Sequence, residues 1–474
     1  MKKDNDLLQN TLLLSLGTFI TKAINLIMIP LFSRWLSTED YGAFDLLCTY
    51  IALLLPFITM SSSEAIFRFI VDKANKIEKS VYITNGLAID LFNSVIAIFA
   101  LSVIKFISGW EMAVPFIVLL VIQTIGSHLQ GFLRGIKKLN VYSLSSTVST
   151  IFIVFSVTIF ILVFNMGLKG MIYGYALGYS VGWLIIIIWT HYWEYVKIES
   201  ISIPCIKEMI QYSYALIPNN IAWWIINVSD RTFISIFLGA VANGIYAIAY
   251  KIPNFCASIF NLFSISWQQA ATEMVDDSER ESYYNQIYNK TVAVIISLCG
   301  GLLALNFFLF HYVFDMRYFE AKMYAPILIT AGVFNSLTQY FGGIQISLKK
   351  SKENGITTII GAAINIIIDL ALIQFIGLYA AAVSTLIANI AVTIIRNYQL
   401  KKEIDFKMEK NTMVYMGIYI YLFIMCYLSD YIVIACINVL VSIWLFYSIN
   451  KGLIIKIFNK IFKTQLVKNK QILN

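Results

Sequence analysis

Long apolar runs recur from one end of this chain to the other, and they constrain its fold more than any other feature. Of the 474 residues, 59% are hydrophobic and 13% are charged, whereas an ordinary soluble domain has about 25% charged residues. A run of about 20 apolar residues crosses the hydrocarbon core of a bilayer as a helix. The composition therefore excludes a soluble fold, and the pattern lacks the short alternating strands of a membrane barrel.

The runs predict an all-α integral membrane protein with about 14 transmembrane helices. We expect these helices at residues 9–33, 43–69, 81–106, 112–133, 142–165, 170–190, 209–238, 244–270, 290–312, 323–347, 355–376, 379–396, 412–429 and 431–450. The seventh run is longer than a bilayer requires, which implies a tilt, a protrusion or a break near Pro218. The basic residues from Lys451 onward predict a cytoplasmic tail that lies on the membrane surface.

A weak internal repeat predicts the domain organisation. The segment Leu36–Phe44 (LSTEDYGAF), after the first helix, aligns without gaps with Leu238–Tyr246 (LGAVANGIY), after the seventh, although a chance match is the alternative. The spacing predicts two six-helix bundles related by a pseudo-two-fold axis along the membrane normal, with a site between them. The predicted domains are residues 1–195, residues 205–400, helices 13 and 14 at 410–450, and the tail at 451–474.

The basic residues predict the orientation in the membrane. With the N-terminus in the cytoplasm, most of the 35 lysines and arginines fall on that side, as the positive-inside rule expects. Both termini are then cytoplasmic, and the net charge of +8 marks one membrane face rather than a nucleic-acid surface. The six cysteines are scattered singly without metal-ligand spacing, so we interpret them as packing residues and expect no metal site.

Charged side chains inside the apolar runs are the candidate site residues. A charge at bilayer depth costs roughly 2.5 to 3.5 kcal/mol on insertion scales, so it persists where it pairs or faces a water-filled cavity. We interpret the bases as lining a substrate cavity, and the acids as coupling-ion sites or charge partners. The bases are Lys22, Arg68, Arg231 and Lys251, and the acids are Glu64, Asp90, Asp230 and Asp369.

Simpler interpretations exist for two of these groups. Glu64 and Arg68 are four residues apart on one helix face, so they could form a neutral packing pair. Asp230 and Arg231 point about 100° apart on a helix and do not pair with each other, but they could cap a helix end. Asp369 is the better candidate for binding a coupling proton or sodium ion, because no basic residue lies near it in the sequence.

Pro218 predicts a hinge in the seventh run. It frees a backbone carbonyl one turn earlier, and Asn219 and Asn220 place amide groups beside the break. These two asparagines are candidates for lining the substrate cavity, although a merely tolerated kink is the alternative.

Catalytic motifs are missing from the sequence. The three histidines, at positions 128, 191 and 311, are far apart in the sequence. The sequence has no HExxH, GxSxG or phosphate-binding glycine loop. We therefore expect neither an enzyme nor a bound cofactor.

Several of these segments together resemble the oligosaccharide flippases of the Wzx type. These form the polysaccharide-transport branch of the superfamily that also holds the multidrug and toxin extrusion antiporters and the lipid II flippases. The resemblance covers nearly the whole chain, and its most specific segments are Ile29–Ser37 (IPLFSRWLS), Glu64–Phe69 (EAIFRF), Ala215–Asn220 (ALIPNN), Ser229–Arg231 (SDR) and Tyr250–Pro253 (YKIP).

The resemblance implies transfer of an undecaprenyl-pyrophosphate-linked oligosaccharide from the cytoplasmic to the outer leaflet of a bacterial inner membrane, by alternating access. It implies a role in making O antigen, capsule or exopolysaccharide, with a polysaccharide polymerase and chain-length machinery as partners beside the membrane lipids. A basic cavity suits the pyrophosphate, and coupling to a proton or sodium gradient is in keeping with the superfamily.

Two other functions are the alternatives. A multidrug antiporter of the same superfamily would favour an acidic cavity for cationic drugs, whereas here the buried bases roughly match the acids in number. A membrane glycosyltransferase or polymerase would be expected to carry a sizeable loop outside the cytoplasm, and the loops predicted there are short.

The predicted topology can be tested with reporter fusions. Because the lysines mark the cytoplasmic loops, we expect a cytoplasmic signal from fusions after Lys79, Lys138, Lys352 and Lys402, and an outside signal near Thr38, Gly109, Lys169 and Tyr318. An outside signal at Lys352 together with a cytoplasmic one at Tyr318 would show that a helix has been miscounted.

Overall fold

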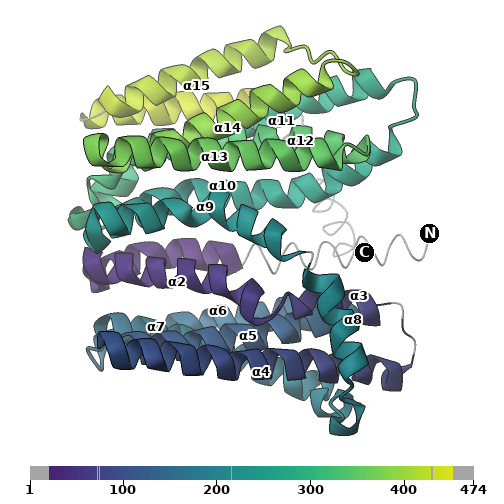
Figure 1. Cartoon of the computed structure of the whole chain (residues 1–474). Helices are drawn as coiled ribbons and strands as arrows, with labels where there is room; N and C mark the ends of the chain where they lie inside the picture. The colour runs from purple at the N-terminus through teal and green to yellow at the C-terminus, as the bar shows by residue number, and fades with distance from the viewer. Residues whose placement is uncertain (1–20, 72, 74, 215, 429–430, 452–474) are drawn as a thin grey trace, which may run out of the picture. The chain divides into compact units, whose positions relative to one another are not determined.

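The structure is a computed structural model that describes residues 21–451 except 72, 74, 215, 429 and 430. All secondary structure in this range is helical, which confirms the predicted all-α class (Figure 1). The chain divides into two compact units, residues 1–247 and 248–474, and each is described by itself. The start of the first predicted helix and nearly all of the basic tail lie outside the described residues.

The first unit begins with a helix that covers residues 21–35. Its further helices are α2 (Thr38–Ile58), α3 (Ser62–Ile70), α4 (Lys76–Ser108), α5 (Ala113–Gly135), α6 (Leu139–Leu162), α7 (Gly167–Thr190), the short turns η1 (Tyr192–Tyr195) and η2 (Ile198–Ser200), α8 (Ile203–Tyr214) and α9 (Ile217–Phe237). The next helix, α10 (Gly239–Glu273), begins in this unit and continues into the second.

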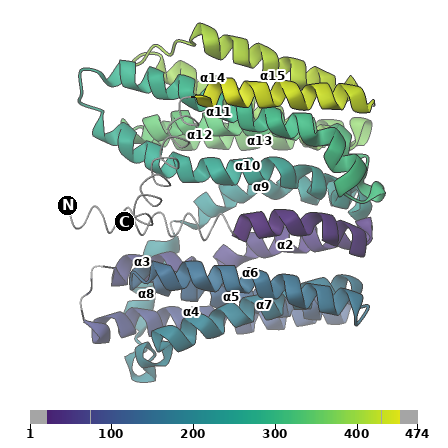
Figure 2. The same ribbon diagram turned by 180° about the vertical axis from the view of Figure 1, so that it is seen from behind.

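The second unit contains the rest of α10 and the later helices. These are α11 (Arg280–Phe308), η3 (Leu309–Val313), η4 (Met316–Tyr318), α12 (Ala321–Ser347), α13 (Ser351–Ile376), α14 (Leu378–Leu400), α15 (Lys410–Leu428) and a helix at Ile432–Lys451. Within this unit α14 packs against α12 and α13, and α15 packs against α11 (Figure 2).

Ten helices of the described residues are long and apolar enough to cross a membrane, so the chain is a multi-pass membrane protein. The predicted total of 14 spans stays a prediction, because the first predicted span, 9–33, lies partly outside the described residues, and α9, α10 and α12 are not among the ten. The predicted domain boundaries also stay predictions. The boundary between the two units falls inside α10, because α9 packs against α2 and thereby joins the first unit.

The prediction of one continuous second helix over residues 43–69 is wrong. The helix begins at Thr38, where the Ser37 hydroxyl accepts a hydrogen bond from the Asp40 N–H at 3.0 Å, as an N-cap serine does. It then breaks after Ile58, and α3 starts at Ser62. Met60 and Ser61 have positive φ angles of 48° and 51°, a conformation that non-glycine residues rarely adopt. No glycine marks this break in the sequence.

The break predicted near Pro218 is present. The helix α8 ends at Tyr214 and α9 begins at Ile217, with Pro218 in its first turn. A proline is accommodated there because the first N–H groups of a helix have no partner within it. Pro218 therefore starts a helix rather than bending one.

Glycines spaced four residues apart allow α7 to approach α6 closely. Gly174 and Gly178 face Val157 and Ile153, and an added Cβ would come within 2.5 Å and 2.3 Å of those side chains. Gly170 and Gly182 continue the same stripe. In a membrane, helix association is driven by close packing rather than by hydrophobic burial. Small residues such as these glycines permit that close packing.

We expect Gly174→Leu and Gly178→Leu to lower the thermal stability and membrane abundance of the protein, because the added side chain separates α6 from α7. Overpacking of this kind typically costs about 1 to 3 kcal/mol. Gly417→Leu is the matched control, since nothing lies within 4 Å of a Cβ built at Gly417. Melting curves of the purified variants check this, and equal losses in all three would contradict the packing argument.

Candidate transport site

A buried ion pair joins α2 to α9. The Arg231 guanidinium donates through Nε to Asp45 Oδ2 at 2.5 Å, and the two residues are 4% and 7% exposed. On the same helix, Asp230 accepts a hydrogen bond from the Tyr246 hydroxyl at 2.9 Å. The interpretation of Asp230 and Arg231 as a helix cap is wrong, because both lie inside α9, whose last residue is Phe237. Each has found its own partner, as their divergent directions predicted.

The two repeat segments found in the sequence contact each other next to this ion pair. A Cβ added to Gly42 would lie 1.9 Å from the Ala240 carbonyl oxygen, and one added to Gly244 would lie 2.1 Å from that of Thr38. Each glycine thus faces the carbonyl oxygen of the residue four positions before the other glycine. The Asn243 side-chain amide also donates to the Gly42 carbonyl at 2.7 Å. This reciprocal contact is what two copies of one segment make around a two-fold axis.

A polar cavity of about 350 Å³ lies in the first unit. Its walls come from the first helix, α2, α5, α6 and α7, and none of the described residues that line it is charged. The polar and aromatic residues of the lining are Thr21, Asn25, Gln123, Ser127, Gln130, Ser145, Ser146, Ser149, Thr150, Tyr175, Tyr179 and Trp183.

Two buried donors on the cavity wall, the Thr21 hydroxyl and the Trp183 indole N–H, have no hydrogen-bond partner among the described residues. A buried donor without a partner costs about 1 to 3 kcal/mol, so a ligand or water that satisfies it is favoured. The sequence analysis missed this cavity. The signal was the dense serine and threonine pattern of residues 143–150, whose members can share one helix face.

Three fully or nearly fully buried side chains meet in the same unit. His128 contacts Asp90 Oδ2 through Nδ1 at 2.9 Å and the Tyr192 hydroxyl through Nε2 at 2.7 Å. The Ser62 hydroxyl donates to Asp90 Oδ1 at 2.7 Å. The sequence predicted Asp90 as a site residue but set the histidines aside, because the three are far apart from one another and match no catalytic motif. His128 and Asp90 are 38 residues apart in the sequence.

Glu64 has a different partner from the one weighed in the sequence. Its carboxylate accepts hydrogen bonds from both terminal nitrogens of Arg134 on α5, at 2.7 Å and 3.4 Å. The guanidinium carbon of Arg134 also lies 5.1 Å from the centroid of the Phe67 ring. Arg68, the partner considered from spacing, is exposed.

In the second unit, two buried ionisable side chains form hydrogen bonds with neutral groups. Asp369 is fully buried and accepts a hydrogen bond from the Ser384 hydroxyl at 2.7 Å. Arg396 is 5% exposed and donates to the Thr357 hydroxyl, the Thr338 carbonyl and the Asn354 side chain at 2.8 to 3.0 Å. The span predicted at residues 379–396 ends at Arg396, whereas α14 continues to Leu400.

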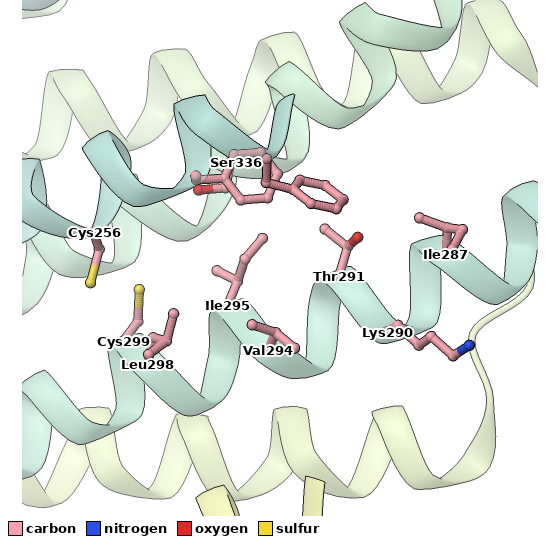
Figure 3. Close-up of a pocket in the computed structure, with 11 residues that line it drawn as sticks. Cys256, Ile287, Lys290, Thr291, Val294, Ile295, Leu298, Cys299 and Ser336 are labelled. Atoms are coloured by element: carbon pink, nitrogen blue, oxygen red, sulfur yellow. The ribbon is translucent and has the colours of Figure 1, made fainter. Parts of the chain in front are cut away.

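An apolar pocket of about 270 Å³ lies between α10 and α11, with Ser336 of α12 in its wall. Figure 3 shows Cys256 and Cys299 at one end of the pocket and the Lys290 side chain at the other. Between them the wall is formed by aliphatic and phenylalanine side chains, chiefly Phe260, Phe263, Val294, Ile295 and Leu298. An apolar slot with a cation at its end has the chemistry that a lipid chain and its phosphate require.

The remaining predicted site residues lie at several places. Lys22 is exposed on the first helix, next to Thr21 in the cavity wall, and Lys251 is half-buried on α10. The Asn220 amide donates to the Ser61 hydroxyl at 3.2 Å. The side chain of Asn219 lies outside the described part of the structure.

The fold and these buried polar sites define a multi-helix membrane protein, and comparison with known proteins finds the same fold in membrane transporters. A lipid II flippase, MurJ, in an inward closed conformation superposes with a TM-score of 0.69 and 17% identity, over 94% of this chain and 100% of that one. An outward-facing multidrug resistance MATE transporter gives 0.57 and 15%, over 86% and 96%. A transporter of the MOP superfamily from Pyrococcus furiosus gives 0.55 and 16%, over 83% and 95%.

The chain belongs to the family of polysaccharide biosynthesis proteins, whose model matches residues 7–267. No curated protein matches the sequence. The family agrees with the resemblance predicted from the sequence, and the fold is shared with the MurJ flippase and the MATE transporters.

We expect Arg231→Gln to lower the stability of the protein strongly, because it leaves the buried Asp45 carboxylate without its cation. Breaking such a pair typically costs about 3 to 5 kcal/mol. The double variant Asp45→Asn with Arg231→Gln should recover part of that loss. Arg317→Gln removes one partner of an exposed ion pair with Asp315 and should cost less than about 1 kcal/mol. Melting temperatures check these values, and additive losses in the double variant would contradict the coupling.

Proposed function

We propose that this protein flips a lipid-linked oligosaccharide from the cytoplasmic to the outer leaflet of a bacterial inner membrane, with both termini in the cytoplasm. The observation that carries the proposal is the polar cavity of the first unit. Its hydroxyl and amide groups suit the hydroxyl groups of a sugar, and Tyr175, Tyr179 and Trp183 offer rings against which a sugar can pack. The product would be a surface polysaccharide such as O antigen, capsule or exopolysaccharide.

The position of Lys22 supports one orientation of the substrate. Lys22 follows Thr21, which lines the cavity, and lies within one turn of Asn25, which also lines it. In a lipid-linked oligosaccharide the pyrophosphate is bonded directly to the first sugar. With the sugars in the cavity, Lys22 is the nearest of the four predicted bases in sequence, and Arg68 and Lys251 remain candidates for the same headgroup.

The apolar pocket beside Lys290 supports a substrate with a long lipid chain. Its wall is almost entirely hydrocarbon, which suits a segment of a prenyl chain such as that of undecaprenyl pyrophosphate. Lys290 at its end can attract a phosphate. In the predicted topology α11 starts on the cytoplasmic side, which is the leaflet where such a lipid is assembled.

The contact between α2, α9 and α10 serves in this proposal as the outer gate. The predicted topology places Thr38 outside, so the glycine contact and the Asp45–Arg231 pair close the outer side. Alternating access then requires this contact to open. Arg231 acts in the gate rather than as a headgroup ligand, and Asp369 is a candidate for binding a coupling proton or sodium ion.

A cation-coupled multidrug antiporter is the second candidate, because the same fold occurs in MATE transporters. Cationic drugs favour a cavity with carboxylates. The described lining of the polar cavity contains none, which favours a neutral sugar. A polysaccharide polymerase and its chain-length machinery would act on the flipped product.

The proposal predicts that filling the cavity blocks transport without unfolding the protein. We expect Ser146→Phe, which places a ring in the cavity, to reduce surface polysaccharide at least roughly tenfold, as a loss of about 1.4 kcal/mol of binding would. Lipid-linked oligosaccharide should then accumulate inside the cell. Leu144→Phe is the control, because Leu144 is exposed on the same helix.

The readouts are surface polysaccharide, intracellular lipid-linked oligosaccharide and membrane abundance, measured in cells whose own flippase gene is deleted. Full export by Ser146→Phe at normal abundance would contradict the cavity as the sugar site. Resistance to cationic drugs that depends on the cavity, without any effect on polysaccharide, would instead support the antiporter.

A further inference from the structure

The buried cluster of Asp90, His128 and Tyr192 has the composition of a proton-binding site. Asp90 and His128 are each 0% exposed, and Tyr192 is 8% exposed. The contacts run from the Ser62 hydroxyl to Asp90, from Asp90 to His128, and from His128 to the Tyr192 hydroxyl, at 2.7, 2.9 and 2.7 Å. Burial raises the pKa of Tyr192 and the neighbouring Asp90 adds to this, so its hydroxyl stays neutral and can either donate or accept.

The energetics of burial favour one bound proton on the Asp90–His128 pair. A carboxylate beside a neutral imidazole leaves a net negative charge in an apolar interior, which is costly. One added proton makes the pair neutral overall, whether it lies on the carboxyl group or on the ring. In both arrangements the serine donates to the carboxyl group, and Nε2 of the ring carries a hydrogen and donates to the Tyr192 oxygen. When the proton leaves, Nδ1–H donates to the carboxylate and the tyrosine reverses its role, donating to Nε2.

The surroundings of the cluster keep water and other charges away. Buried apolar side chains around it include Ile66, Ile83, Leu129, Phe132 and Met209. Several titratable and charged groups are on the elements packed around it. Glu64 pairs with Arg134, Lys76 pairs with Glu194, and Arg68 is exposed. The others are Glu78, Lys79, Lys105, Tyr82, Tyr195, Cys205, Lys207, Glu208, Tyr212 and Tyr214.

Hydrogen bonds connect the cluster to the break between α2 and α3. Ser62, which donates to Asp90, is the first residue of α3, and Ser61 before it has a positive φ of 51°. On the other side of the break, the Asn93 amide donates to the Ile58 carbonyl at 2.8 Å. The helix α4 thus holds both ends of the break, through Asp90 and Asn93.

The same break is bonded to α9. The Asn220 amide donates to the Ser61 hydroxyl at 3.2 Å, and Asn220 lies in the first turns of α9, shortly after Pro218. The helix α9 also carries Arg231 of the proposed gate. Ser62 and Ser61 are adjacent, so a shift of Ser62 also affects the hydrogen bond between Ser61 and Asn220 of α9.

We propose that Asp90 and His128 together bind one exchangeable proton, and that its binding and release are transmitted through Ser62 and Ser61 to Asn220 on α9. The site would supply the coupling ion of transport, so this part of the inference rests on the proposed flippase function. The route uses a helix break held in a left-handed conformation, which is a hinge that small changes in hydrogen bonding can move.

Proton binding can be tested without the substrate, by labelling the purified protein with an apolar carbodiimide, which reacts with protonated buried carboxyl groups. Labelling of Asp90 is followed by mass spectrometry from about pH 5 to about pH 9, a range that brackets the ordinary pKa of an imidazole. We expect His128→Gln to move the midpoint of Asp90 labelling upward by about one pH unit or more. The reason is that the variant loses the imidazole, which, when protonated, stabilises the ionised form of Asp90. Labelling of Asp369 in the same samples is the control and should not move.

Coupling is tested in proteoliposomes that contain a lipid-linked oligosaccharide. We expect a pH gradient to change the flipping rate of the wild-type protein several-fold. Asp90→Asn, which keeps the shape and both hydrogen bonds, should flip at the same rate with and without the gradient. Asn220→Leu should lose the gradient response while the labelling profile of Asp90 stays that of the wild type.

Three results would overturn the inference. One is a labelling midpoint of Asp90 that His128→Gln does not move. Another is an absence of Asp90 labelling in both the wild-type protein and the His128→Gln variant. The third is a gradient response of Asp90→Asn equal to that of the wild type. If the wild type flips no lipid-linked oligosaccharide at all, the proposed function fails, while the labelling experiment still decides whether the proton site exists.

Discussion

Charge compensation between helices determines where this chain can place an ionisable side chain. Arg231 finds its carboxylate 186 residues away, Arg134 finds Glu64 at a distance of 70 residues, and His128 finds Asp90 at 38. In a bilayer the hydrophobic effect does not distinguish one helix neighbour from another. These polar contacts therefore specify which helices lie together, and the apolar side chains fill the space that the contacts leave.

The second unit satisfies its buried charges differently. Arg396 is surrounded by hydroxyl, amide and carbonyl groups from α12 and α13, and Asp369 by the Ser384 hydroxyl. Dipoles solvate a buried ionisable group without neutralising it. The first unit, by contrast, pairs acids with bases, and its pairs can change when a proton or a helix moves.

The sequence predicted local features well, but it did not predict which side chains on different helices contact each other. The length of an apolar run predicts a helix directly, so α4, α6, α7 and α13 begin and end within a few residues of their predicted limits. Pro218 signalled a real break, because proline is restricted at the backbone level. The break at Met60 and Ser61 carried no such signal, since its left-handed residues are stabilised by Asn93 and Asn220 from other helices.

In the candidate site, too, the sequence indicated single residues but not their partners on other helices. Depth and charge were sufficient to single out Asp90, Arg231 and Asp369, each of which is buried. They could not reveal the roles of His128 or Arg134, because a partner on another helix leaves no trace in the local pattern. The polar cavity was missed because serines and threonines are ordinary in membrane helices, and only the folded chain shows that their hydroxyls surround one space.

The contact between Gly42 and Gly244 has a mechanical consequence. Backbone meets backbone there, with carbonyl oxygens where side chains would be, so a side chain at either glycine would hold the two segments apart. The missing side chains therefore define a single position in which the segments fit together. The contact therefore fixes the register of the two segments and does not let them slide along each other.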